Sequence, residues 1–284
     1  MLQSAKELGE MKPRLQKFNS ITRTRYGHLI FNVNDIYLGK ALELYGEWSQ
    51  GEVDLLLSLI KNDDVVIDAG AHIGTLTVPL AQKAKIVYAF EPQPYLFHIL
   101  CGNVAINSLT NVIPLLEAVG AKDDRIEVPM LNPTIKNNFG GLSLINYHGL
   151  PPPSYDGKSV IVPLVTIDSL NLSKCNLIKI DVEGMEKDVI LGAKETIKKL
   201  RPILYVEADR PQLRNKILKT IESFDYNMWQ HHPPLFNPQN FKANQQNEFG
   251  EVVSVNVLSL PMPMRLPNHL KDKVYKLERV ENAS

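Results

Sequence analysis

A turn at residues 68–74, with the sequence DAGAHIG, contains the residue types that indicate ligand binding most directly. It stands between a short β-branched run at residues 65–67 and a helical pattern at residues 76–84. Glycines such as Gly70 and Gly74 let the backbone approach a ligand closely, and the start of the following helix offers free N–H groups. We therefore expect this turn to hold a small molecule.

The other positions of the turn indicate which molecule that is. A dinucleotide site has the pattern Gly-x-Gly-x-x-Gly, but its second and third glycine positions here hold His72 and Thr75, which would crowd a pyrophosphate. The carboxylate of Asp68 suits a ligand that brings its own cation, such as the sulfonium of S-adenosylmethionine. This cofactor is favoured, with Asp68, Gly70, His72 and Gly74 as binding residues. A tight turn in which Asp68 only caps the helix is the structural alternative.

Two further strand ends would complete the cofactor site. Glu91 ends the apolar run at residues 86–90, 17 residues after Gly74, where doubly wound sheets carry an acid that binds ribose hydroxyls. Both NAD and S-adenosylmethionine would use such a carboxylate, and a solvated strand-end acid is the simpler alternative. Glu117 and Ala118 follow the strand pattern at residues 111–116, and we place them near the adenine ring.

Acidic residues also follow the strand pattern at residues 177–180, in the sequence IDVEG. Ligand crevices of open α/β sheets collect their polar residues at such strand ends. Asp181 is the first candidate for orienting the acceptor or taking its proton as general base, followed by Glu183. For Glu183, an acid that complements a helix dipole is the alternative.

His231 and His232 begin a loop rich in proline and asparagine, and Glu207 and Asp209 follow an earlier strand. His231 could serve as a base beside such acids. A metal site is not expected, because adjacent histidines lack the ligand spacing of a helix and the carboxylates lie far off in the sequence. A surface loop stiffened by prolines is the alternative interpretation.

The elements that must position these residues alternate between apolar strand runs and helical patterns from about residue 65 to residue 257. This alternation is typical of βαβ units and a parallel sheet. We predict a doubly wound α/β fold whose sheet has seven mostly parallel strands, the last of them antiparallel. The predicted organisation is a lead segment and lid at 1–50, a catalytic domain at 51–260 with insertions at about 122–163 and 231–250, and an exposed tail at 261–284.

These motifs together resemble the FkbM-type methyltransferases. The resemblance covers roughly residues 37–209 and rests on the segments VIDAGAHIG (66–74), FEP (90–92), NVAIN (103–107), TIDSL (166–170) and IKIDVEG (178–184). It implies a class I methyltransferase fold with S-adenosylmethionine as donor. The usual acceptor in the family is a hydroxyl on a sugar or natural product.

The resemblance also implies roles for individual residues. Gly70, His72, Gly74 and Glu91 match cofactor-binding positions, although the family often has asparagine where this chain has His72. The stretch that begins at Glu47 resembles the cofactor lid of the family. The match is thin in both insertions, and we expect these insertions to choose the acceptor.

Composition limits the partners. The 284 residues include 31 basic and 31 acidic side chains, so no global field attracts nucleic acid or an anionic membrane. No apolar run approaches a membrane span, and the first residues lack the pattern of a secretory signal. Two cysteines do not make a disulfide framework. We expect a cytoplasmic protein acting on a small-molecule, glycan or peptide acceptor, and an oligomer is compatible with the sequence.

Three other functions stay open at this stage. Methyl transfer to a nitrogen of a peptide or amine would use the same cofactor residues. A nicotinamide-dependent oxidoreductase is disfavoured by the missing glycines and by the lack of a Tyr-x-x-x-Lys pair. A binding scaffold could keep the cofactor fold without turnover.

Overall fold

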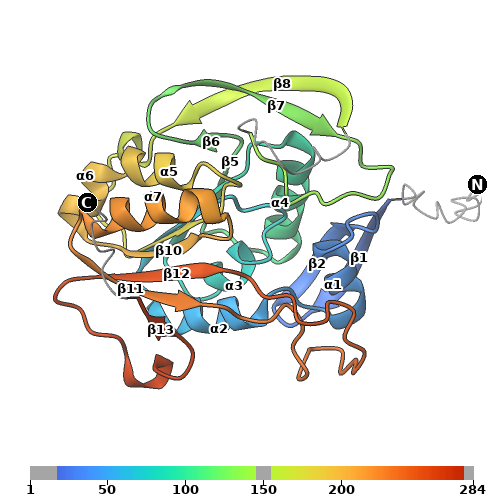
Figure 1. The fold of residues 1–284 in the computed structure, drawn as a ribbon. Coiled ribbons are helices and arrows are strands. Elements are labelled where there is room, and N and C mark those ends of the chain that lie inside the picture. Colours follow the sequence, from blue (N-terminus) through green and yellow to red (C-terminus); the bar gives the residue numbers. More distant parts are fainter. Residues whose placement is uncertain (1–17, 145–154, 278–284) are drawn as a thin grey trace, which may run out of the picture.

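The computed structural model describes residues 18–144 and 155–277, and an eight-stranded sheet forms its centre (Figure 1). The order of the strands across this sheet is β13-β11-β12-β10-β9-β3-β4-β5. Their bounds are β3 Val65–Ala69, β4 Ile86–Phe90, β5 Val112–Leu115, β9 Leu177–Ile180, β10 Ile203–Glu207, β11 Tyr226–His231, β12 Asn256–Pro261 and β13 Tyr275–Lys276.

The predicted doubly wound α/β fold is confirmed. Strands β5, β4, β3, β9 and β10 pair in parallel, and β12 lies antiparallel between β10 and β11. The seven expected strands are therefore present, and the two-residue β13 adds an eighth at the edge, antiparallel to β11. Because the chain leaves β3 toward β4 on one side and places β9 on the other, the order reverses between β3 and β9. Ligands of open α/β sheets bind at the carboxyl ends beside such a reversal.

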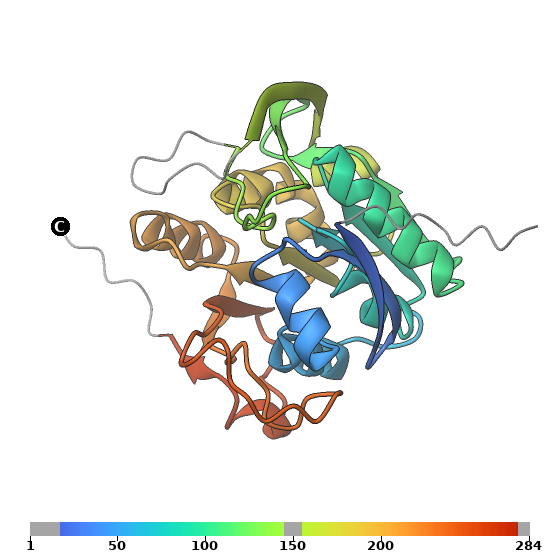
Figure 2. The same ribbon diagram turned by 90° about the vertical axis from the view of Figure 1, so that its right-hand side faces the viewer.

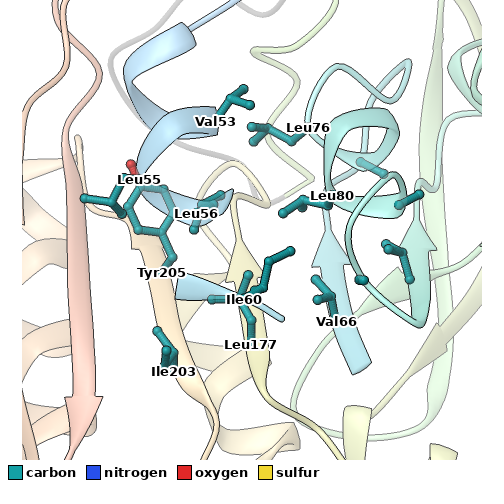
Figure 3. Packing of buried hydrophobic residues seen from close by; sticks show 14 of the residues in the cluster. Val53, Leu55, Leu56, Ile60, Val66, Leu76, Leu80, Leu177, Ile203 and Tyr205 are labelled. Carbon is teal, nitrogen blue, oxygen red and sulfur yellow. The ribbon is translucent and has the colours of Figure 1, made fainter. Parts of the chain in front are cut away.

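The helices cover both faces of the sheet because the central strands are apolar on both faces. Helices α2 (Gln50–Leu59), α3 (Thr77–Ala81) and α4 (Pro94–Ile106) pack on one face, where Val66 and Leu177 point. Figure 3 shows this layer, with Leu56 of α2 and Leu80 of α3 above the strands. The opposite face, which includes Ile67, is covered by α5 (Glu186–Gly192), α6 (Lys194–Leu200) and α7 (Pro211–Glu222).

A buried amide is one of the contacts that attach an N-terminal hairpin to this core. Strands β1 (Asn19–Thr24) and β2 (Gly27–Asn32) pair antiparallel and are followed by α1 (Leu38–Tyr45). The Asn103 side chain on α4 accepts a hydrogen bond from Ile30 N (2.6 Å) and donates to Ile30 O (3.0 Å) and Ile73 O (2.7 Å). Asn103 therefore joins the hairpin to the turn that the sequence assigns to the cofactor.

The insertion expected at about 122–163 forms a separate small sheet. Strands β6 (Ala118–Val119), β7 (Asp124–Leu131) and β8 (Tyr155–Val165) pair in the order β6-β8-β7, and β7 and β8 are antiparallel. These two strands form the ribbon at the top of Figures 1 and 2. The prolines at 151–153 lie outside the described residues, as does most of the segment 1–20.

The segment after residue 260 corrects the expectation of an exposed tail. Leu270, in the 3-10 helix η2 (Asn268–Leu270), is fully buried and Val274 is 4% exposed, both within the core cluster that contains Trp229. The sequence of this segment does not reveal its burial, because the core cluster that it joins is built from residues far away along the chain, such as Trp229 of β11. Residues 278–284 of the predicted tail lie outside the described part. No helix in the described ranges combines the length and apolar character that a bilayer span requires.

We predict that Leu270→Ala lowers the free energy of unfolding by about 2–4 kcal/mol, because it empties a filled position of the core. Met264→Ala is the control, since Met264 is 45% exposed in the same segment and should change stability by less than about 0.5 kcal/mol. Urea denaturation followed by circular dichroism measures both. Equal effects of the two substitutions would contradict the packing of this segment on the core.

Candidate active site

A cavity of about 410 Å³ lies at the carboxyl ends of β3, β4, β9 and β10. The turns after these strands form its floor. Its walls come from three other segments, namely Tyr37, Leu38 and Trp48 near α1, residues 138–142 after β7, and residues 252–255 before β12. The reversal point of the sheet therefore opens into a cavity, as expected for a ligand site of this fold.

The turn after β3 allows a ligand to approach the backbone closely, because the residue at its most crowded position is a glycine, Gly70. Gly70 has φ +82°, and a Cβ there would lie 1.7 Å from the carbonyl oxygen of Asp181. The amides of Gly70 and Ala71 donate to Phe90 O at 3.0 and 2.8 Å, so the turn folds over the end of β4. Gly74, at φ +91°, packs against the Leu100 side chain and does not line the cavity.

Glu91 lies where the sequence predicts a ribose-binding acid. It lines the cavity and its two carboxylate oxygens accept hydrogen bonds from the backbone amides of His72 and Gln93, each at 2.9 Å. Burial raises the pKa of Glu91 to about 7, although both amides favour the ionised form. Glu117 and Ala118 also line the cavity, one strand farther along the sheet.

His72 turns its ring into the same space. Neither ring nitrogen has a hydrogen-bond partner among the described residues, although both are enclosed, and the residue lines the cavity with φ +52°. Burial lowers the pKa of His72 to about 4, so the imidazole is neutral at pH 7. Buried polar atoms without partners cost free energy, which a bound ligand would recover.

Asp68 supports the turn and does not contact the ligand space. Its carboxylate is completely buried, accepts a hydrogen bond from the Thr77 hydroxyl at 2.7 Å, and lies 3.1 Å from the Lys179 ammonium. It does not line the cavity. The sequence-based assignment of Asp68 to direct contact with a sulfonium is therefore corrected, because a buried lysine already neutralises it.

Glu47 also differs from its expected role in the cofactor lid. Its carboxylate pairs with Arg25 at 2.6 Å and accepts hydrogen bonds from the Asn237 side chain and the Phe241 amide. These contacts tie the β1–β2 hairpin to the loop at 231–250, away from the main cavity. The neighbouring Trp48 lines the cavity instead.

His231 is not placed to act as a base. Its ring shares a 2.8 Å hydrogen bond between Nδ1 and the hydroxyl of Tyr205, it is 4% exposed, and it does not line the cavity. Because β11 extends through His231, the side chain belongs to the sheet and not to the loop that follows. The prediction of a catalytic His231 is therefore corrected.

The carboxylates after β9 and β10 meet at the far side of the cavity. Asp181, Glu183 and Glu207 each place one oxygen within 4.8 Å of the others. Burial raises the pKa of Glu183 to about 8 and that of Glu207 well above its ordinary value, with the charge of Asp181 as a further cause for both. The Arg210 guanidinium pairs with Glu183 and lies 3.8 Å from Glu207. Three such oxygens could hold a divalent cation, but the positive charge of Arg210 would repel a cation bound between these carboxylates.

The sequence interpretation missed two basic residues of this site. Lys179 lies inside a strand pattern and Arg210 stands directly before the proline that opens α7. Both line the cavity and are less than a tenth exposed. A lysine within an otherwise apolar strand was the available signal, because a buried lysine requires a partner.

Comparisons with known proteins agree with this geometry. Residues 68–232 match the methyltransferase FkbM domain, which is more than half of the chain. The chain belongs to this family. The domain is therefore an S-adenosylmethionine-dependent methyltransferase domain, and the glycine cradle at Gly70, the acid Glu91 and the unpartnered ring of His72 suit this donor.

Two curated relatives are similar to parts of this chain. The hexuronic acid methyltransferase AglP of Haloferax volcanii is 30% identical over 165 residues, covering 57% of this chain and 62% of that protein. The tRNA(Phe) (4-demethylwyosine(37)-C(7)) aminocarboxypropyltransferase of Methanocaldococcus jannaschii is 46% identical over 74 residues, or 24% of this chain and 30% of that protein. The chain thus spans less than two thirds of the length of both relatives.

Among solved structures, the methyltransferase FkbM from Methylobacillus flagellatus KT is similar to this chain at 16% identity. The match has a TM-score of 0.47 and covers 70% of this chain and 44% of that one.

We predict that Gly70→Ala weakens binding of S-adenosylhomocysteine at least about tenfold, because the added methyl group would displace the Asp181 backbone. Gly157→Ala is the matched control: Gly157 has φ +80° and nothing within 4 Å of its Cβ position. Both substitutions introduce the same backbone strain of about 1 kcal/mol, but only the first should change the affinity. Calorimetry and thermal unfolding measure the two effects. Equal affinities would show that the turn does not approach the ligand.

We also predict that S-adenosylhomocysteine affinity rises with pH up to about 7 and is level above it. If the ribose lies at Glu91, its hydroxyls donate to the ionised carboxylate, so binding below the pKa of Glu91 must first remove a proton. The affinity should then fall by up to about tenfold per pH unit. Calorimetry between pH 5.5 and 8 measures this slope. Glu91→Gln should bind more weakly and remove the slope, and an unchanged slope in Glu91→Gln would assign it to another group.

Proposed function

We propose that this chain transfers the methyl group of S-adenosylmethionine to a hydroxyl of a sugar or a small natural product. The observation that carries the proposal is the order of polar residues along the carboxyl edge of the sheet. Glu117 follows β5, Glu91 follows β4, Gly70 follows β3 and Asp181 follows β9, all lining one cavity. A donor with its adenine at Glu117 and its ribose at Glu91 would extend toward Gly70 and Asp181.

The acceptor would then lie beyond Asp181, between the carboxylates and the apolar walls. The bound donor supplies an electrophilic methyl group. The residues of this chain have to exclude water, align the acceptor oxygen and receive its proton. Trp48 and Phe139 provide the apolar walls, and Asp181 lies at the boundary between the two ligands with its carboxylate 37% exposed.

Asp181 and Glu183 are proposed to have different roles in the reaction. Asp181 lies 3.6 Å from the Lys179 ammonium and its side chain is 37% exposed, so it can reach an acceptor hydroxyl, orient it and accept its proton. Glu183 pairs with Arg210 and, through burial, has a raised pKa of about 8. It is therefore proposed to hold the acceptor in place. The similarity to a hexuronic acid methyltransferase supports a sugar as acceptor.

Methyl transfer to an amine is the second candidate. The acids at the far side of the cavity outnumber the basic residues there, which favours a cationic group. A peptide or other amine would then be the acceptor. A panel of neutral sugars, uronic acids and amines, assayed by formation of S-adenosylhomocysteine, distinguishes the two candidates.

We predict that Asp181→Asn lowers kcat with the acceptor found in this panel by about 100-fold, because a general base typically contributes that much. Affinity for S-adenosylhomocysteine, measured by calorimetry, should change by less than about threefold, since the backbone of residue 181 stays in place. Asp124→Asn, on the exposed β7 strand, is the control and should leave both values unchanged. Full turnover in Asp181→Asn would remove this carboxylate from the reaction.

A further inference from the structure

Lys179 is the basic residue buried most deeply beside the cofactor turn. It occupies the third position of β9, whose other residues are Leu177, Ile178 and Ile180, and it is 3% exposed. Burying an ammonium without partners costs several kcal/mol, so its contacts must compensate. A lysine at the centre of an apolar strand indicates a specific requirement for its charge.

The contacts of Lys179 join the three parts of the site. Its ammonium donates a hydrogen bond to the carbonyl oxygen of Gly70 at 2.6 Å, and lies 3.1 Å from Asp68 Oδ1 and 3.6 Å from Asp181 Oδ2. The sheet register places Lys179 directly across from Asp68 on β3. The ammonium thus hydrogen-bonds the cofactor turn and lies within ion-pair distance of both the strand before it and the proposed base.

The positive charge also lies where the methyl-donor end of the ligand is expected. Gly70, Lys179 and Asp181 line the cavity together at the junction of β3 and β9. If the ribose lies at Glu91, one strand away, the sulfur atom extends toward this junction. S-adenosylmethionine carries a positive sulfonium there, whereas the product S-adenosylhomocysteine has a neutral thioether.

The positive charge of Lys179 partly compensates the negative charge of several acids around this junction. Arg210 is engaged with Glu183 on the far side, so Lys179 is the cation that faces the turn. The acids that line the cavity with these two basic residues are Glu91, Glu117, Asp181, Glu183, Glu207 and Asp209. Without the ammonium, the uncompensated carboxylates would attract a cation more strongly.

We propose that Lys179 is a positioning residue that fixes the Gly70 turn against Asp181, and that its charge sets the affinity for the sulfonium donor relative to the thioether product. The proposal rests on methyl-donor binding at this site. The proposed function does not require Lys179 to contact the acceptor. The ammonium limits the extra affinity that the surrounding carboxylates give to the positively charged donor, and so keeps the affinities for donor and product similar. A lysine that only stabilised the fold would affect both ligands equally.

The test compares the dissociation constants of S-adenosylmethionine and S-adenosylhomocysteine for three variants, by calorimetry at pH 8. Lys179→Met removes the charge and the donors, Lys179→Arg keeps the charge, and Lys174→Met is the control. Lys174 is 40% exposed and pairs with Asp63 outside the cavity, so its loss gives the same change in net charge. Lys179→Gln replaces Lys179→Met if the latter does not fold.

Lys179→Met should weaken product binding about tenfold or more through the loosened turn, and should weaken donor binding less. The ratio of the donor constant to the product constant should therefore fall at least about threefold. Lys179→Arg and Lys174→Met should keep the wild-type ratio. An unchanged ratio in Lys179→Met, or in Lys179→Gln where this variant replaces it, would overturn the proposal. Failure of the wild-type protein to bind either ligand would instead overturn the function proposed above.

Discussion

The structure depends on the contact between the turn after β3 and the backbone at the end of β9. The carbonyl oxygen of Asp181 occupies the space that any side chain at position 70 would need. This contact lies at the point where the strand order reverses. It therefore brings the turn after β3 and the carboxylates at the ends of β9 and β10 to the same cavity. The Lys179 ammonium stabilises the same junction, because it donates a hydrogen bond to Gly70 O and lies 3.6 Å from the Asp181 carboxylate.

The buried charges of the site are arranged in two groups. Asp68, Lys179 and Asp181 form the first group, in which the lysine is shared between two carboxylates. Arg210 organises the second, with Glu183 and Glu207 as its neighbours. Such pairs contribute little net stability after desolvation, and their value lies in holding side chains in defined positions. This suits a reaction that relies on aligning two ligands.

Segments outside the central sheet form walls of the cavity. The stretch with Tyr37 and Trp48, residues 138–142 and residues 252–255 come from three separate parts of the chain. Loops that vary within a fold usually carry specificity, because the scaffold beneath them does not depend on their sequence. The family therefore identifies the donor, and we propose that these segments select the acceptor.

The sequence by itself determined the sheet, the family and the cofactor turn. These features are encoded in contiguous residues: glycines at 70 and 74 that permit positive φ, an acid at 91 after an apolar strand, and strand and helix periodicities that alternate. Only the tertiary structure decided which polar residues face the cavity. Asp68, Glu47 and His231 have the right types and spacing, yet Lys179, Arg25 and Tyr205 bind them elsewhere. These partners lie tens to more than a hundred positions away along the chain, and local patterns hold no information about such distant pairings.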